Sequence, residues 1–141
     1  MSVTGDFNQQ VIDEFRANAG KVGGMFEGAA MVILHTTGAR SGRAIVSPLV
    51  YFRETGDDAD SIVIVASAGG ADRHPAWYHN LVANPGVTVE YGSETRPMRA
   101  SVVTGEERDR LFAEQVARAP GFGEYQAKTS RVIPVISLDP V

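Results

Sequence analysis

The chain has 141 residues, of which 43% are hydrophobic and 21% are charged, and its formal net charge at pH 7 is −4. This length and composition predict a single globular domain, residues 1–141, with one sizeable core. The acidic balance argues against nucleic acid as a partner, because non-specific nucleic-acid binding needs a basic face. The sequence has no cysteine, which excludes disulfides, a thiol nucleophile and thiolate metal ligands.

The N-terminal segment, residues 1–28, is predicted to be a helix with a flexible, glycine-rich lead-in to the rest of the chain. Asp6 is placed to cap a helix from Phe7 to about Ala19, and Gly20 is placed to end it. One alternative is a helix that lies on a membrane surface, but the polar face of this helix carries too little positive charge to favour anionic lipid. An apolar stripe indicates that the helix packs on a sheet, and it consists of Phe7, Val11, Ile12 and Phe15.

No membrane-spanning segment is expected, because no apolar run approaches the ~20 residues that a span requires. The first six residues lack the basic and apolar regions of a signal peptide. We therefore expect a cytoplasmic protein, with peripheral contact to a membrane as an alternative. The sequence leaves open whether the protein is a monomer or a homodimer.

Two strands are predicted at residues 30–36 and 44–53, and the loop between them has an unusual composition. Residues 36–43 include two glycines, three hydroxyl side chains and two arginines, and residues 28–53 contain no Asp or Glu. Backbone N–H groups, hydroxyls and guanidinium groups on one tight loop are the donors that an anion needs. The loop therefore predicts an anion site, with solvated loop arginines as the simpler alternative.

A second small-residue loop follows the third predicted strand, residues 61–67. This loop, residues 67–70, is also suited to bind an anion, and a short helix over residues 76–82 comes after it. Pro48 in the second strand has no N–H for a ladder, so it marks a strand edge, a bulge or a ligand-facing site. Pro97 in a later strand indicates another edge.

The remaining segments complete an α+β pattern without regular alternation of strands and helices. Further strands are expected at residues 87–91, 95–103 and 131–138. A capping box at residues 104–107 predicts a helix that ends near Ala119, and a helical turn is expected at residues 122–128, after a break at Pro120 and Gly121. About six mainly antiparallel strands joined by short turns predict a small closed or split β-barrel with covering helices.

The sequence contains no motif for a serine nucleophile, a nucleotide phosphate loop or a zinc protease. Its three histidines, His35, His74 and His79, lack the spacing of a metal site, so no metal is expected. A chain with anion sites but no evident acid, base or nucleophile either only binds its ligand or holds a cofactor that carries the reaction. Hydride transfer from a flavin-like ring suits hydroxyls, backbone N–H groups and aromatic walls, all of which are present.

Three groups of residues occur in an order and at a spacing typical of a known family. They are residues 36–42 with 47–49, then 66–70, 75–78, 80–81 and 83–85, and lastly 125–126, 129, 131 and 133–135. From about residue 30 to its end, the chain thus resembles the deazaflavin (coenzyme F420)-dependent nitroreductases. The resemblance implies a split β-barrel of the FMN-binding type that uses reduced F420 to transfer hydride to a hydrophobic, electron-poor acceptor. Such acceptors are quinones, enone or coumarin-type lactones and nitro compounds.

Two alternatives stay open beside an F420-dependent oxidoreductase. The same barrel could use FMN, although an arginine loop suits the longer and more anionic tail of F420. The protein could also be a non-catalytic carrier of the coenzyme or of a lipophilic ligand.

The resemblance also implies the roles of individual residues. The first loop would contact the anionic tail of the coenzyme, the strand at residues 46–50 its ring system, the second loop its phosphate side, and the short helix would form a wall. The coenzyme-binding residues expected are Ala39, Arg40, Ser41, Arg43, Val46, Ser47, Pro48, Leu49, Val50, Ala66, Ser67, Ala68, Ala76, Trp77, Tyr78, His79 and Asn80. Phe122 and Tyr125 would contact the substrate, with Tyr125 as the catalytic donor. For Trp77, Phe122 and Tyr125, packing in the core is the alternative interpretation.

Three positions depart from the family pattern. Ala68 stands where the family often has lysine, and Ile45 where it often has a basic residue, so both departures weaken the anion site. A charge-assisted contact contributes about 1.5–3 kcal/mol, which puts more weight on Arg40 and Arg43, with Arg73 as another compensating cation. Phe122 stands where the family often has tyrosine, and its missing hydroxyl predicts poor reduction of nitro compounds.

Overall fold

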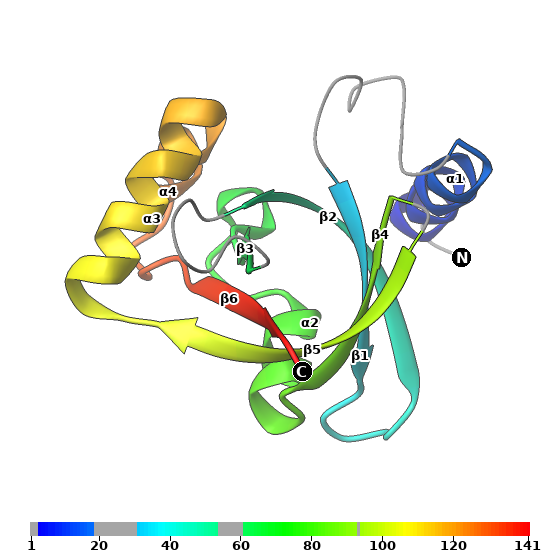
Figure 1. Ribbon diagram of the computed structural model, residues 1–141. Helices are drawn as coiled ribbons and strands as arrows, with labels where there is room; N and C mark the ends of the chain where they lie inside the picture. Colours follow the sequence, from blue (N-terminus) through cyan, green and yellow to red (C-terminus); the bar gives the residue numbers. More distant parts are fainter. Residues whose placement is uncertain (1–2, 19–30, 54–60, 93) are drawn as a thin grey trace.

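The computed structural model describes residues 3–18, 31–53, 61–92 and 94–141. Six antiparallel strands form a closed barrel in the order β1-β2-β3-β6-β5-β4, with helices on its outside (Figure 1), which confirms the predicted barrel architecture. The strands are β1 (Met31–Thr37), β2 (Ala44–Arg53), β3 (Ile62–Val65), β4 (Gly86–Tyr91), β5 (Glu94–Val103) and β6 (Val135–Pro140). The helices are α1 (Val3–Ala17), the 3-10 helix η2 (Ala68–Gly70), α2 (Ala76–Ala83), α3 (Gly105–Arg118) and α4 (Gly121–Ala127).

Two long strands change partners along their length. Residues 44–50 of β2 pair with β1 and residues 51–53 pair with β3, and β5 passes likewise from β4 to β6. Within the described part of the chain, the first part of β2 therefore has a strand on one side only, and the long curve of β2 is visible in Figure 1. Pro48 lies in this stretch, opposite Ile33, and Pro97 lies in the corresponding stretch of β5. Both positions confirm the strand edges that a missing N–H predicts.

Apolar side chains that alternate along the strands fill the inside of the barrel. Val32 and Leu34 of β1 belong to this inner cluster, whereas Ile33 between them faces α1. Trp77 and Leu81 of α2 complete the cluster, and Trp77 is only 8% exposed. Trp77 is thus a core residue, as the alternative interpretation of its role predicts.

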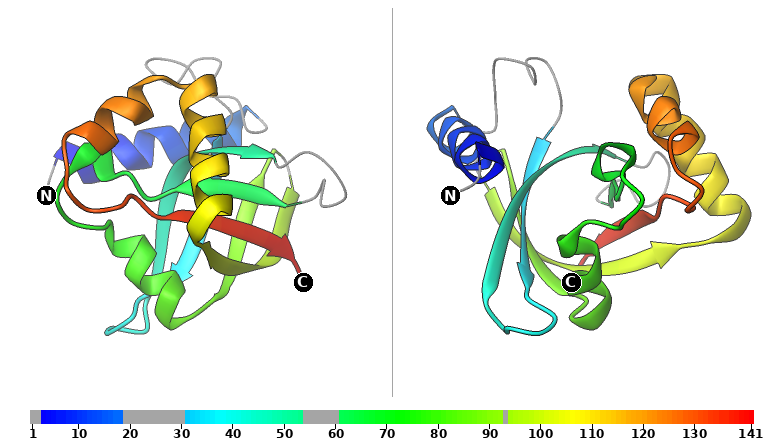
Figure 2. Two further views of the ribbon diagram at one scale, coloured as in Figure 1. Left: turned by 90° about the vertical axis from the view of Figure 1, so that its left-hand side faces the viewer. Right: turned by 180° about the vertical axis from the view of Figure 1, so that it is seen from behind.

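Helices cover two opposite sides of the barrel (Figures 1 and 2). On one side, α1 packs Val11, Ile12 and Phe15 onto Met31 and Ile33 of β1, which confirms the predicted helix-on-sheet packing. On the other side, α3 and α4 bury a separate apolar cluster against β2, β3 and β6. Burial of apolar surface stabilises by ~25 cal/mol per Å². Helices of this length are marginal in isolation, so these apolar contacts, and not helix propensity, stabilise them.

The first helix differs from its predicted boundaries. It begins at Val3 rather than at Phe7, so Asp6 lies within the helix and is not its cap. It ends at Ala17. The predicted stop at Gly20 and the predicted flexible connection at residues 21–27 lie outside the described residues.

Three further local predictions need correction. β3 ends at Val65 because Ser67 already has helical backbone angles, φ −74° and ψ −35°. β6 begins at Val135 and not at Arg131, because Arg131 binds a neighbouring loop instead of a strand. Thr104 precedes α3 as expected, but its side chain makes no capping hydrogen bond, so the predicted capping box does not form.

Candidate functional site

The loop between β1 and β2, residues 38–43, is closed by its own backbone. The N–H of Gly38 donates to the carbonyl of Arg43 at 2.8 Å, and the N–H of Gly42 donates to the carbonyl of Gly38 at 3.0 Å. Gly42 has φ +69°, a conformation that favours glycine, and a Cβ on Gly38 would clash with Ser41 Oγ. The two glycines that the sequence pattern singles out thus fix the tight shape of this loop.

Asn80 of α2 joins the helix to the loop. Its side chain is buried, Oδ1 accepts from the N–H of Ala39 at 2.9 Å, and Nδ2 donates to Thr36 Oγ1 at 3.3 Å. Farther along the same helix end, Asn84 Nδ2 donates to the carbonyl of Thr37 at 3.3 Å. The sequence predicts Asn80 only as a wall of the site. It does not reveal this positioning role, because the partners are 41 and 44 residues away in the chain.

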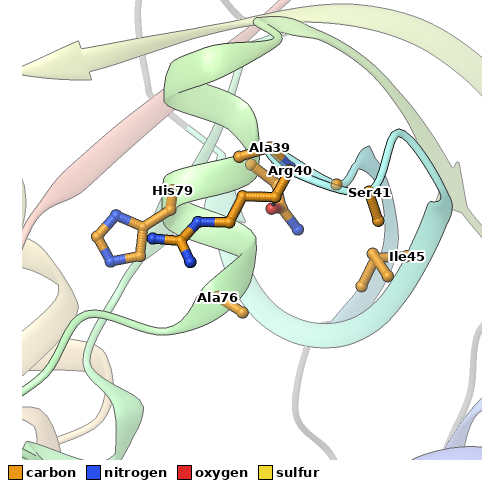
Figure 3. Close-up of a pocket in the computed structure, with 8 residues that line it drawn as sticks. Ala39, Arg40, Ser41, Ile45, Ala76 and His79 are labelled. Carbon is orange, nitrogen blue, oxygen red and sulfur yellow. Dashed lines mark hydrogen bonds between the residues drawn. The ribbon is translucent and has the colours of Figure 1, made fainter.

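A pocket of about 610 Å³ lies between the loop and α2 (Figure 3). The side chain of Arg40 extends toward His79, and Ile45 of β2 stands at another side. Among the residues that the structure describes, no acidic side chain lines this pocket and no carboxylate pairs with Arg40. We call this cavity the Arg40 pocket. Its lining residues are residues 38–41, Ile45, Ala76, His79 and Asn80.

The expected coenzyme-binding residues fall into two groups in the structure. Those that line the Arg40 pocket are Ala39, Arg40, Ser41, Ala76, His79 and Asn80. The strand residues lie elsewhere, since Val46 and Val50 pack toward α1 and Leu49 packs into the barrel. Tyr78 packs against the barrel core beside Trp77. The expected residues outside the lining of the Arg40 pocket are Arg43, Val46, Ser47, Pro48, Leu49, Val50, Ala66, Ser67, Ala68, Trp77 and Tyr78.

The second small-residue loop is held by Arg131, whose guanidinium donates to a set of backbone carbonyls. Nη2 donates to Ser67 at 2.7 Å, Nη1 to Ala66 at 3.2 Å and Nε to Ala71 at 2.7 Å. Nη1 also lies 2.9 Å from His74 Nδ1. The sequence shows Arg131 only as part of the third family-like motif, and its function as a clamp on this loop depends on partners about sixty residues away.

The backbone of this second loop is left-handed at two positions, Ala68 with φ +48° and Gly70 with φ +85°. A Cβ on Gly70 would lie 2.9 Å from the carbonyl oxygen of Tyr125, so glycine allows α4 to pack directly on η2. Ala68 adopts a conformation that costs an L-residue roughly 1–2 kcal/mol. The loop is therefore kept in its shape by α4 and by Arg131.

The predicted substrate residues Phe122 and Tyr125 lie together on α4. Their ring centroids are 5.3 Å apart at an interplanar angle of 70°, and both rings are half-buried against the cluster beneath α3 and α4. The Tyr125 hydroxyl hydrogen-bonds to no other described residue, and neither ring lines the Arg40 pocket. Next to them, Gln126 Nε2 donates to the carbonyl of Arg131 at 2.7 Å, which connects α4 to the clamp.

A cluster of three rings lies on the N-terminal side of α2. The His74 ring lies 4.6 Å from the Tyr78 ring and 5.8 Å from the His79 ring, measured between centroids. Burial lowers the pKa of His74, and the charge of Arg131 and the neighbouring His79 lower it further. His74 is therefore neutral near pH 7, which suits its contact with the Arg131 guanidinium.

The comparison with known protein families gives a clear result. The profile of the family described as F420H(2)-dependent quinone reductase matches residues 8–140. The chain belongs to this family. An F420H2-dependent quinone reductase of Mycobacterium tuberculosis is 38% identical over 128 residues, which cover 88% of this chain and 83% of that protein.

Solved structures agree with membership of the F420H2-dependent quinone reductase family. A solved F420H2-dependent reductase is 40% identical and superposes with a TM-score of 0.68 over 77% of this chain and 93% of its own. A domain-swapped dimer, 33% identical, superposes with a TM-score of 0.69 over 98% of this chain and 100% of its own. A Listeria innocua protein assigned as a pyridoxamine 5′-phosphate oxidase shares only 11% identity at a TM-score of 0.53, which shows the same split-barrel fold and no more. The resemblance stated from the sequence is thus confirmed.

The described part of the chain holds neither a metal-binding cluster nor a membrane-spanning helix. Among the residues that the structure describes, no group of three or more histidine and acidic side chains is arranged to hold a metal ion. Across the same residues, every helix is too short or too polar to cross a membrane.

Proposed function

We propose that the protein is an F420H2-dependent reductase that acts on a hydrophobic, electron-poor acceptor, first of all a quinone. The observation that carries the proposal is the Arg40 pocket, where a guanidinium without an acidic partner among the described residues stands on a glycine-shaped loop. Membership of the F420H2-dependent quinone reductase family supports this choice of coenzyme.

The donors of the Arg40 pocket fit the anionic tail of F420. The Arg40 guanidinium can give two parallel hydrogen bonds to a phosphate or carboxylate. The backbone N–H groups of Arg40 and Ser41 bond to no other described residue, so they are available to the same anion. Because Asn80 already fixes Ala39, the loop is ordered before the coenzyme arrives, which lowers the entropic cost of binding.

The one-sided part of β2 supports a place for the ring system. Among the described residues, residues 44–50 have a strand, β1, on one side only, so we infer that backbone N–H and C=O groups on the other side are available to the polar edge of a planar ring. The side chains of Val46 and Val50 pack toward α1 and that of Leu49 into the barrel. We therefore propose that residues 46–50 contact the ring through their backbone.

When bound, reduced F420 would supply the hydride, and the residues of the chain would bind, orient and shield. Arg131 keeps the backbone of residues 66–71 in place beside α4. We assign the acceptor side to Phe122 and Tyr125, with the Tyr125 hydroxyl donating a hydrogen bond to the acceptor oxygen. Since Phe122 offers only apolar contact, we propose that quinones are better acceptors than nitro compounds.

The test begins with binding. The purified protein is titrated with oxidised F420 and, separately, with FMN, and the fluorescence of Trp77 and of the cofactor is followed. We expect saturable binding of F420 at micromolar concentration and much weaker binding of FMN. Tight binding of FMN without binding of F420 would favour the alternative that the protein is FMN-dependent. Binding of neither cofactor would contradict the proposal.

Turnover is tested next, by adding reduced F420 and following its reoxidation with a quinone, an enone lactone and a nitroimidazole in turn. We expect the quinone to give the highest kcat/KM and the nitroimidazole the lowest. If F420 binds but no acceptor reoxidises it, the carrier alternative is favoured. The expected cytoplasmic location stays a prediction, to be tested by cell fractionation.

A further inference from the structure

A second pocket, of about 310 Å³, lies between α2, the end of β5, the start of α3 and the segment before β6. None of its described lining residues also lines the Arg40 pocket. His74 and Tyr78 line it, and both belong to the ring cluster whose third member, His79, lines the Arg40 pocket. The function proposed above assigns nothing to this cavity, which we call the His74 pocket.

The contact between Arg131 and His74 fixes the proton on the His74 ring. Arg131 Nη1 lies 2.9 Å from His74 Nδ1, and a guanidinium has only donors, so Nδ1 must accept. The ring proton of a neutral His74 therefore stands on Nε2. The His74 pocket is thus lined by a neutral ring that carries one N–H donor.

Two hydroxyls add to this donor, and the nearby cation is already engaged. Within the described part of the chain, neither the Tyr78 hydroxyl nor Thr104 Oγ1 makes a hydrogen bond. Arg108 donates to the carbonyl of Ile133 from both Nε and Nη2, at 3.1 and 2.8 Å, and Nη1 pairs with Asp109 at 3.1 Å. Among its described lining residues, the pocket therefore offers neutral donors, while the charges of Arg108 and Asp109 compensate each other.

Apolar side chains form the rest of the wall. Val102 is 40% exposed and Val132 is 67% exposed, and both line the His74 pocket together with Val103. A volume near 310 Å³ stands at the small end of ligand sites, which span roughly 300–1,000 Å³. We propose that the His74 pocket is a second binding site, separate from the coenzyme site, for a neutral carbonyl-bearing compound of one or two rings. Valines contact the ring, and His74, Tyr78 or Thr104 donates to the carbonyl oxygen.

The probe is menadione, a neutral two-ring quinone, titrated by calorimetry into the coenzyme-free protein. We expect at least a tenfold loss of affinity at one site in Val132→Asp, because a carboxylate at the rim disfavours an apolar ring. Val102→Asp is expected to act in the same way. Val82→Asp is the matched control, since Val82 is 52% exposed on α2 and lines neither pocket, and its affinity should equal that of the wild type.

A further variant, Ile45→Asp, tests whether menadione binds in the Arg40 pocket instead, because Ile45 is a lining residue of that pocket. Loss of menadione binding in Ile45→Asp, with full binding in Val132→Asp, would overturn the inference, as would the absence of saturable binding. The anion of 2-hydroxy-1,4-naphthoquinone should bind at least tenfold more weakly than menadione, and equal affinity would contradict the claim of a neutral ligand. Thermal melts confirm that each variant is folded. No coenzyme or turnover enters this test, so its outcome is independent of the proposed function.

Discussion

At the scale of single residues, Arg40 is the side chain on which the proposed coenzyme site depends most. Ile45 and Ala68 stand at two positions where the resemblance predicts basic residues. Arg43, the other arginine of the loop, does not line the Arg40 pocket. The loop presents Arg40 without an acidic partner among the described residues, so its full charge is available to a ligand. The overall charge of −4 gives no hint of this local arrangement.

Replacement of Arg40 by alanine should therefore weaken F420 binding. The loss of one charge-assisted contact, about 1.5–3 kcal/mol, corresponds to roughly a 10- to 150-fold increase in Kd. The ratio of variant to wild-type Kd should shrink as ionic strength rises, because salt screens this exposed charge. Arg43→Ala is the control and should have a smaller effect. Equal effects of the two changes, or none from Arg40→Ala, would refute the assigned role.

Asn80 gives a second prediction, which concerns stability. Asn80→Leu removes both hydrogen bonds of the side chain and leaves the N–H of Ala39 and the hydroxyl of Thr36 without a partner. The free energy of unfolding, measured by urea denaturation, should fall by about 1–3 kcal/mol, and F420 affinity should fall with it. Asn84→Ala loses one longer hydrogen bond and should cost less. A wild-type unfolding curve for Asn80→Leu would contradict the positioning role.

At the scale of elements, α1 is fastened to the barrel by a charged group as well as by its apolar stripe. Arg16 donates to both carboxylate oxygens of Glu90 on β4, from Nε at 3.0 Å and from Nη2 at 2.8 Å. His35 Nε2 of β1 lies 2.6 Å from the same carboxylate. The Arg16 hydrogen bond lowers the pKa of Glu90 below its usual value, and its effect exceeds the opposing effect of burial.

This carboxylate makes the attachment of α1 sensitive to acid. Because the pKa of Glu90 is lowered in the folded state, its contribution to stability is present above the ordinary value of 4.5 and is lost as pH falls through the folded pKa. Arg16→Gln should remove most of this contribution. Urea unfolding of the wild type and of Arg16→Gln, at neutral pH and below about pH 4, measures this contribution. The difference in unfolding free energy between the two proteins should narrow in acid. A gap that is constant or widens would contradict the assignment.

At the scale of the whole molecule, the ionisation of His74 produces a second pH dependence. Its pKa is lowered in the folded protein, so the unfolded chain binds this proton first and stability falls as pH drops below 6.5. His74→Gln cannot bind the proton. Between about pH 7.5 and about pH 5.5, wild type should lose more unfolding free energy than His74→Gln. Parallel curves over this range would show that His74 does not titrate as inferred.

Much of the architecture follows from local patterns in the sequence. The apolar stripe of α1 and the prolines of β2 and β5 gave correct packing and edge positions, because burial and a missing N–H act wherever these residues stand. The predicted boundaries of α1, β3 and β6 were wrong, and a boundary that a tertiary contact sets cannot be predicted from a local pattern. The start of β6 is one such case, since Arg131 engages carbonyls at residues 66–71.

The candidate site was predictable in its composition but not in its arrangement. The glycines and arginines of residues 38–43 indicate an anion loop by themselves, and residues 38–41 of this loop line the Arg40 pocket. The clamps formed by Asn80 and Arg131 depend on partners more than forty residues away, and no periodicity encodes such contacts. The direction in which the side chains of Val46 and Val50 point depends on which face of β2 meets α1. That face is determined only in the assembled barrel.

The one-sided stretch of β2 has a consequence for how copies of this protein meet each other. An extended row of free N–H and C=O groups is a template for a strand of a second molecule, and such edges promote aggregation. Pro48 stands within this row and cannot donate, so it interrupts the template in the absence of any ligand. Pro48→Val should leave the barrel intact and increase light scattering on concentration or heating, and F420 should suppress the increase. The open edge that we propose for the coenzyme ring thus carries, at Pro48, a residue that cannot donate a hydrogen bond to the strand of a second molecule.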